Sequence, residues 1–222
     1  MQIGKPQEDT YLHKGMRKQL VDTLRNKGIK DEKVLAAINN VPRHFFLDTA
    51  FERIAYEDRA FEILAKQTIS HPFTVAFQTE LLQIKKFDKV LEIGTGSAYQ
   101  SCILAELGAM VFSIERQREL YDFVDKNFSF IKKYPTIKRF YGDGYAGKAT
   151  FAPFDKIIVT AGAPFVPDKL IEQLKPGGIF VIPVGDENGQ RMLKITKEID
   201  HKIITEELGD FDFVPMLEGR NG

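Results

Sequence analysis

A short glycine turn between an apolar strand and a helix-like segment constrains this chain more than any other feature. The apolar run at residues 89–93 stops at Gly94-Thr95-Gly96, and a helical pattern follows from Ser97. A strand, a tight turn and a helix start, in this order, form the nucleotide entrance of a doubly wound α/β sheet. Glycine suits such a turn because a Cβ atom would keep a ligand away from the backbone.

An acidic residue follows the glycines at the distance expected for a ribose ligand. The next apolar run, residues 110–114, ends in Glu115. This acid lies about 20 residues beyond the turn, where such folds place a carboxylate on ribose hydroxyls. An ordinary solvated acid would also fit this position. Together, however, the turn and the acid indicate a ribonucleoside ligand.

The absence of a third glycine narrows the choice of ligand. A dinucleotide site usually reads Gly-x-Gly-x-x-Gly because a pyrophosphate sits on the helix N-terminus. Here Tyr99 stands at the third position. Tyrosine in place of the third glycine favours a cofactor that has ribose and adenine but no phosphate, and S-adenosylmethionine fits that description. A nicotinamide oxidoreductase remains an alternative, as does a turn that binds nothing.

The alternation of apolar strands with helical patterns predicts a Rossmann-like α/β fold with a mostly parallel twisted sheet of about seven strands. The C-terminal region lacks helices between its strands, which predicts an antiparallel edge. We expect one domain over residues 1–222, with a helical cover at 1–60 and the cofactor-binding core at 61–222. Strands are expected at residues 89–93, 110–114, 137–141, 155–160, 179–183, 192–197, 202–208 and 211–216. Helices are expected at 12–26, from the Asp31 cap to Pro42, from the Ser70 cap to about Ile84, and at 97–107, 118–132 and 167–174.

Composition argues against several classes of protein. The chain has 31 basic and 31 acidic residues, so its balanced charge gives no reason to expect binding to nucleic acid or to an anionic membrane. The single cysteine, Cys102, cannot form an intrachain disulfide and offers no metal cluster. No apolar run approaches the ~20 residues of a membrane span, and the first residues lack a signal-peptide core. We expect a cytoplasmic monomer without a metal site.

Several further motifs occur in order along most of the chain, from about Met16 to Gly219. They are Gln67-Thr68-Ile69-Ser70 with Pro72, the turn at residues 90–97, Gly142-Asp143-Gly144, residues 152–155, 176–178 and 183–185, and Phe213-Val214-Pro215-Met216. In order and spacing they resemble the protein-L-isoaspartate O-methyltransferase family. The Gln-Thr-Ile-Ser motif is the specific one, because a glycine turn alone occurs in very many methyltransferases.

The resemblance implies a class I methyltransferase fold and a particular reaction. The methyl group of S-adenosylmethionine would pass to the free α-carboxylate of an L-isoaspartyl residue, leaving S-adenosylhomocysteine. The methyl ester re-forms a succinimide, through which damaged proteins and peptides return to the normal linkage. An S-adenosylmethionine enzyme of another specificity remains the main alternative.

The resemblance also assigns site residues, with Ser70 as the catalytic residue. Expected cofactor contacts are Gln67, Thr68, Ile69, Glu92, Gly94, Thr95, Gly96, Ser97, Glu115, Asp143 and Gly144. Expected substrate contacts are Thr68, Ser70, Phe213, Val214 and Pro215. Each motif also has a simpler interpretation: Ser70 as a helix N-cap, Glu92 as a strand-end acid, and Asp143 as part of a plain turn.

The chemistry of this reaction needs little from the protein. A free α-carboxyl group has a pKa of about 3.3–3.7, so the acceptor is already ionised at neutral pH and no general base is required. What remains is alignment and the removal of water. The chain departs from the family pattern at Ala65-Lys66, beside the expected substrate mouth, and at Ala98 in the loop. Alanine at position 98 carries a cost only if its φ angle is positive.

Overall fold

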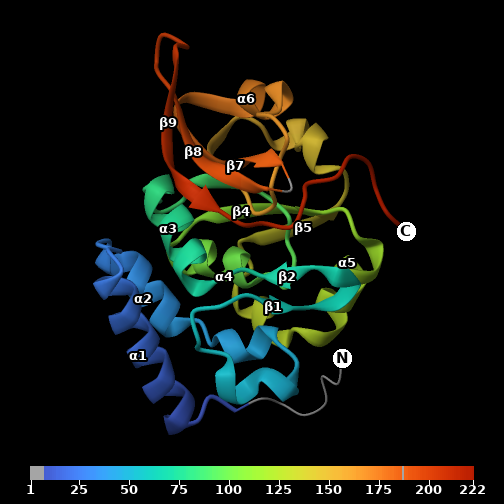
Figure 1. Cartoon of the computed structure of the whole chain (residues 1–222). Coiled ribbons are helices and arrows are strands. Elements are labelled where there is room, and N and C mark those ends of the chain that lie inside the picture. The colour runs from blue at the N-terminus through green and yellow to red at the C-terminus, as the bar shows by residue number, and fades with distance from the viewer. Residues whose placement is uncertain (1–7, 187) are drawn as a thin grey trace.

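The glycine turn follows an inner strand of a seven-stranded sheet (Figure 1). The computed structural model describes residues 8–186 and 188–222. The strand order is β5-β4-β3-β6-β7-β8-β9, with β3 to β7 parallel and β8 and β9 antiparallel. The predicted fold class is therefore confirmed. The strands are β3 (Lys89–Ile93), β4 (Met110–Glu115), β5 (Ile137–Tyr141), β6 (Phe154–Val159), β7 (Leu174–Asp186), β8 (Gly189–Lys197) and β9 (Ile203–Phe211).

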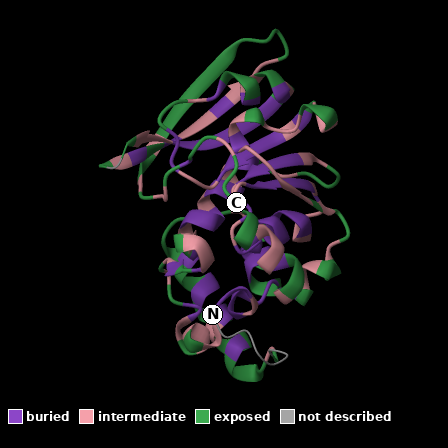
Figure 2. Cartoon of the chain, turned by 90° about the vertical axis from the view of Figure 1, so that its right-hand side faces the viewer, coloured by how far each residue is buried: buried purple, intermediate pink, exposed green. Residues whose placement is uncertain are grey.

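Both faces of the central strands are buried, because side chains along a strand alternate between the two faces. On β3, Val90 belongs to the cluster that contains Leu82 of α3 (Pro72–Leu82) and Leu104 of α4 (Tyr99–Glu106). The next residue, Leu91, belongs to the opposite cluster with Leu170 of α6 (Asp168–Gln173). Figure 2 shows the resulting buried band across the strands. The sheet thus holds its carboxyl edge rigidly.

The N-terminal cover shares a core with the helices that follow the glycine turn. This apolar cluster joins Leu24 and Phe46 of the cover to Phe61, Tyr99 and Val124. Separating the cover from these helices would therefore expose apolar side chains on both. Its elements are α1 (Tyr11–Asn26), α2 (Glu32–Asn40) and the 3₁₀ turns η1 (Arg43–Phe46) and η2 (Thr49–Ile54). The core then begins with a two-stranded hairpin of β1 (Phe61–Glu62) and β2 (Thr68–Ile69), joined through the 3₁₀ turn η3 (Leu64–Lys66). Residues 1–7 of the predicted cover lie outside the described residues.

The N-cap of α2 agrees with the prediction, but that of α3 does not. Asp31 caps α2 as predicted, since its carboxylate accepts from the amides of Lys33 and Val34. The predicted N-cap at Ser70 is wrong, because α3 starts one residue later and His71 occupies the cap position. The Phe73 amide instead donates to Asp58 Oδ1, at 2.8 Å, so a distant acid supplies the capping oxygen.

The C-terminal strand predicted at residues 211–216 is also wrong, because β9 ends at Phe211 and an irregular segment follows. Its backbone groups bond to a loop instead of to a strand ladder. Gly162 donates its amide to the Val214 carbonyl at 2.8 Å, and the Met216 amide donates to the Gly162 carbonyl at 2.7 Å. Pro215, between them, has no amide hydrogen to offer a ladder.

The helix predicted at 118–132 is shorter than expected. The α-helix α5 covers Arg118–Asn127, and a 3₁₀ turn, η4 (Ser129–Lys133), follows it. Two more 3₁₀ turns, η5 (Gly144–Ala146) and η6 (Ala149–Phe151), connect β5 to β6. No helix within the described ranges combines the length and apolar character needed to cross a bilayer.

The departures from the family pattern all adopt left-handed backbone conformations. Ala98 has φ +70°, and Ala65 and Lys66 have φ +58° and +55° in the turn between β1 and β2. A Cβ atom in this region costs roughly 1–2 kcal/mol, so these residues carry local strain that glycine would avoid. Because φ is positive at Ala98, alanine at this position carries the cost expected from the sequence.

The exposed end of α3 offers a direct measure of such strain. Gln83 is the C-cap residue, with φ +52°. Gln83→Gly should raise the free energy of unfolding by about 0.5–1 kcal/mol, because glycine adopts this conformation without a Cβ penalty. Gln83→Ala keeps the Cβ and should change it by less than about 0.5 kcal/mol. Urea denaturation checks both, and an alanine variant as stable as the glycine variant would contradict the explanation.

Candidate active site

A pocket opens at the carboxyl ends of the central parallel strands. It lies where the chain connections diverge, because β3 leads through α4 to β4 on one side while β6 lies on the other. Ligands of open α/β sheets bind at such a switch point. The pocket and its open mouth together hold about 810 Å³ of empty space, open solvent included.

Most of the residues predicted from the sequence lie in the wall of this pocket. They are Gln67, Thr68, Ile69, Ser70, Gly94, Thr95, Gly96, Ser97, Glu115, Gly144, Val214 and Pro215. Three predicted residues, Glu92, Asp143 and Phe213, lie outside this lining. The wall also contains residues that sequence reasoning missed, among them Val75, Gln100, Thr160 and Ala161. Thr160 and Ala161 follow β6, so the rule that ligands bind beyond strand ends could have found them.

The glycine turn is fixed by hydrogen bonds to both neighbouring strands. The amides of Gly94 and Thr95 donate to the Ile114 carbonyl of β4, at 2.9 and 3.2 Å. On the other side, Thr160 Oγ1 donates to the Gly94 carbonyl at 2.7 Å. Gly94 has φ +95°, and a Cβ there would lie only 2.6 Å from Thr160 Oγ1. Only glycine therefore allows the turn to lie between the two strand ends.

Glu115 presents a buried carboxylate beside this turn. Its Oε2 accepts from the Gly96 amide and its Oε1 from the Gln117 amide, both at 2.9 Å. The side chain is almost fully buried, and burial raises its pKa despite these hydrogen bonds. Each carboxylate oxygen can still accept a second hydrogen bond. The acceptor set therefore fits a ligand with paired ribose hydroxyls.

The segment that carries Ser70 is held against the glycine turn by the β1–β2 hairpin. The Ile63 amide donates to the Gln67 carbonyl at 2.7 Å, which closes the hairpin. A Cβ built on Gly96 would lie 3.9 Å from both the Ile63 side chain and the Thr68 carbonyl oxygen. Ser70 follows β2 directly, half-buried in the pocket wall. The fold thus brings the two best sequence motifs together.

The C-terminal segment forms another part of the pocket wall. Val214 and Met216 are tied to Gly162, as described above, and Tyr145 Oη donates to the Met216 carbonyl at 3.2 Å. Beyond them, Asn221 pairs with the loop after β4: its amide donates to the Arg116 carbonyl, and its carbonyl accepts from the Arg118 amide, each at 2.9 Å. Residue 221 is therefore hydrogen-bonded to the loop that directly follows Glu115.

The three predicted residues outside the lining have structural partners. Glu92 is fully buried, and its Oε2 accepts from the Ser101 hydroxyl. Asp143 accepts from the Tyr145 amide at 2.9 Å, as in a plain turn. The Phe213 amide donates to Gln190 Oε1 at 2.7 Å, which anchors the C-terminal segment. Contact between these residues and a ligand stays a prediction.

Cys102 does not suit nucleophilic catalysis. The thiol is fully buried in α4, and burial raises its pKa well above the ordinary value. A reactive cysteine needs an exposed, electropositive setting that favours the thiolate. The residue packs instead in the core shared with the N-terminal cover.

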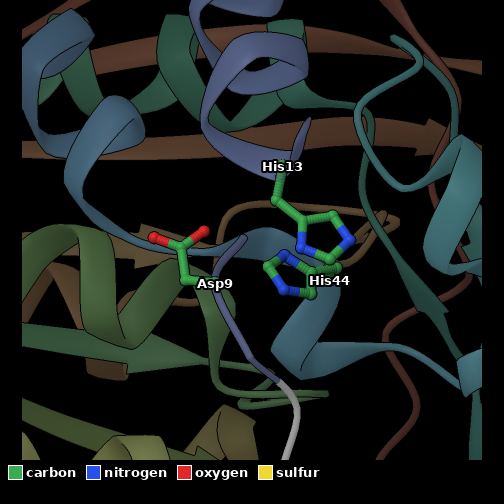
Figure 3. A group of neighbouring side chains, drawn as sticks. All are labelled: Asp9, His13 and His44. Carbon is green, nitrogen blue, oxygen red and sulfur yellow. The ribbon is translucent and has the colours of Figure 1, made fainter. Parts of the chain in front are cut away.

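Asp9, His13 and His44 form a cluster that resembles a metal site (Figure 3). The Asp9 carboxylate, however, pairs with the guanidinium of Arg17 through two contacts of 2.9 Å. The two imidazole rings stack face to face at 3.9 Å. A metal ion would have to displace the guanidinium and be accommodated beside its positive charge.

The ring nitrogens of the two histidines are also engaged by the protein. His13 Nδ1 accepts from the Thr10 amide at 3.2 Å, and its Nε2 lies 3.1 Å from Glu52. His44 Nδ1 lies 2.6 Å from Tyr56 Oη, and burial lowers the pKa of His44 to about 4. We therefore assign the cluster to fastening the start of α1 onto η1.

Comparison with known proteins agrees with this geometry. Residues 15–221 match the family model described as protein-L-isoaspartate (D-aspartate) O-methyltransferase. The chain belongs to this family. It is 56% identical over 219 residues to a protein-L-isoaspartate O-methyltransferase of Christiangramia forsetii, covering 96% of this chain and 100% of the relative. A relative with the same name from Cytophaga hutchinsonii is 53% identical, covering 97% and 96%.

A solved structure extends the family match to the cofactor. The fold resembles a protein from Plasmodium falciparum described as a protein-L-isoaspartate O-methyltransferase, determined with S-adenosyl-L-homocysteine. The TM-score is 0.78 at 26% identity, covering 90% of this chain and 98% of the other. The family member described here is thus an S-adenosylmethionine-dependent methyltransferase.

The buried Glu92 gives the protein a characteristic pH dependence. Burial raises its pKa from 4.5 to about 7, so the folded state holds a proton that the unfolded state releases. The resulting stabilisation is full below pH 4.5 and is lost as the pH rises through 7. Relative to the wild type, Glu92→Gln should therefore gain about 2 kcal/mol of unfolding free energy between pH 5 and pH 8. Urea denaturation at both pH values measures this difference, and a constant difference would contradict the assignment.

Proposed function

We propose that this chain methylates the free α-carboxylate of L-isoaspartyl residues in damaged proteins and peptides. The observation that carries the proposal is the placement of the Gln67–Ser70 segment against the Gly94–Ser97 turn, in one pocket beside Glu115. Family membership over nearly the whole chain supports the same substrate class. Methylation leads back to the succinimide, so the proposed role is protein repair.

The proposed mechanism depends on alignment. S-adenosylmethionine, when bound, supplies a methyl group activated by a cationic sulfonium. The acceptor carboxylate is ionised at neutral pH, so the chain has no proton to remove from it. The Ser70 hydroxyl can donate a hydrogen bond that orients this carboxylate. Ile69, Val75 and Val214 give the pocket an apolar wall that excludes water.

The remaining residues divide the cofactor between them in this proposal. Glu115 accepts from the ribose hydroxyls, for which both of its oxygens have spare capacity. The turn at residues 94–97 surrounds the methionine portion, whose carboxylate suits the amides of a helix start. Gly144 borders the adenine, and a Cβ there would collide with Ile93. Asp143 can accept from the adenine amine while it keeps the Tyr145 amide, because a carboxylate has further acceptor sites.

The peptide is proposed to enter beside Val214 and Pro215. These residues lie in the pocket wall, and the backbone around Pro215 is already tied to Gly162. Lys66, exposed in the β1–β2 turn, lies near the Gln67 side of the mouth. The cytoplasmic location and monomeric state expected from the sequence stay predictions.

The two alternatives are weaker. The S-adenosyl-L-homocysteine in the related structure and the buried Tyr99 at the start of α4 argue against a nicotinamide cofactor. An acceptor of another class would have to fit a pocket that matches the isoaspartyl family in fold and motifs.

A matched pair of peptides tests the proposal. We expect the enzyme to transfer labelled methyl groups from S-adenosylmethionine to an isoaspartyl peptide. The same sequence with a normal aspartyl residue should take up at least 100-fold less label, an order-of-magnitude expectation because only the isoaspartyl linkage exposes an α-carboxylate at this position. Mild base should release the label as volatile methanol. Equal labelling of both peptides, or a label that resists base, would overturn the proposal.

Ser70→Ala tests the proposed catalytic residue. Loss of the orienting hydroxyl should lower kcat roughly 10- to 100-fold, while the affinity for S-adenosylhomocysteine changes less than about threefold. Ser129→Ala, on the exposed η4 turn, is the matched control and should retain wild-type kinetics. A Ser70 variant with full activity on an isoaspartyl peptide would show that the serine has no catalytic role.

A further inference from the structure

Gln100 is a buried polar residue in the pocket wall that the proposed mechanism does not use. It lies in the first turn of α4, immediately after the glycine turn, and only 7% of its surface is exposed. Its Nε2 donates to Thr79 Oγ1 of α3 at 2.9 Å. Thr79 Oγ1 in turn donates to the Val75 carbonyl at 2.7 Å.

This chain of hydrogen bonds fixes the orientation of the Gln100 amide. Because the Thr79 hydroxyl proton is committed to the Val75 carbonyl, its oxygen can only accept from Gln100. The amide nitrogen must therefore face Thr79. The amide oxygen, Oε1, is left buried and has no hydrogen-bond partner within the described part of the chain.

A buried acceptor without a partner is destabilising, so a ligand that donates a hydrogen bond to this oxygen would gain affinity. S-adenosylmethionine offers three kinds of donor: the ribose hydroxyls, the adenine amine and the α-ammonium of its methionine portion. Glu115 already fits the ribose, and Gly144 borders the position proposed for adenine. Gln100 belongs to the helix that continues the Gly94–Ser97 turn, where the methionine portion is proposed to lie.

We propose that Gln100 Oε1 accepts a hydrogen bond from the α-ammonium of the bound methionine portion and so discriminates for amino-acid-bearing adenosines. The inference rests on the proposed function for the identity of the ligand. A neutral amide suits this place because a further carboxylate would repel the anionic acceptor that must approach the same pocket. Gln100 thereby selects the ligand without opposing the substrate.

Binding of two ligands to two variants tests this role. The ligands are S-adenosylhomocysteine and its analogue in which hydrogen replaces the α-amino group, measured by isothermal titration calorimetry. Gln100→Met keeps the length of the side chain and removes the acceptor. We expect it to weaken S-adenosylhomocysteine roughly 10- to 100-fold while the deaminated analogue changes less than about threefold.

Gln78→Met is the matched control. Gln78 is also buried, on α3, and its Nε2 donates to the Val159 carbonyl at 2.9 Å, but it does not line the pocket. This variant should leave the ratio of the two affinities unchanged. Equal losses for both ligands in Gln100→Met, no loss for either, or a ratio that falls as far in Gln78→Met would each overturn the inference.

A second measurement decides the matter if Gln100→Met does not fold. In a crystal structure of the wild-type protein with S-adenosylhomocysteine, the ammonium nitrogen should lie roughly 2.7–3.2 Å from Gln100 Oε1. A separation beyond about 4 Å would overturn the inference. Both measurements use the product without a peptide, so failure here differs from failure to methylate isoaspartyl residues, which would instead remove the proposed function.

Discussion

The hydrogen bonds that fix the glycine turn between β4 and β6 are the constraint on which the site depends. The Ile114 carbonyl on one side and Thr160 Oγ1 on the other leave Gly94 no freedom to shift. With the turn immobile, the Gly96 amide meets Glu115 and α4 starts in a fixed direction. A reaction that requires only alignment gains most from such rigidity, because the cost of ordering the site is met on folding.

Sequence patterns predicted the parallel sheet because its strands are apolar on both faces and are separated by helices. They also predicted the glycine turn and Glu115 in the pocket wall, since glycines and strand-end acids have few other uses in that order. The family resemblance then supplied what periodicity could not: the other predicted site residues, the role proposed for Ser70 and the identity of the acceptor.

The wrong predictions at Ser70 and at residues 211–216 share a physical cause, which is competition from residues distant in the chain. Serine is a common N-cap residue, but at the start of α3 the Phe73 amide donates to the Asp58 carboxylate instead of to Ser70. Residues 211–216 have the composition of a strand, but the backbone groups of Val214 and Met216 form hydrogen bonds with Gly162. The sequence did not predict a role for Gln100, because the orientation of its amide depends on Thr79, which lies on another helix. Local sequence cannot rank such partners, since only the fold sets their distances.

The docking of Asn221 against the loop after β4 has a practical consequence. The peptide groups of residues 116–118 hold the end of the chain on one side, while Glu115 stands at the same strand end. The final residues are therefore bound to the loop that follows Glu115 and do not extend freely from the fold. A fusion partner or purification handle joined directly behind Gly222 would pull on the ribose side of the pocket, whereas a flexible spacer would leave that wall undisturbed.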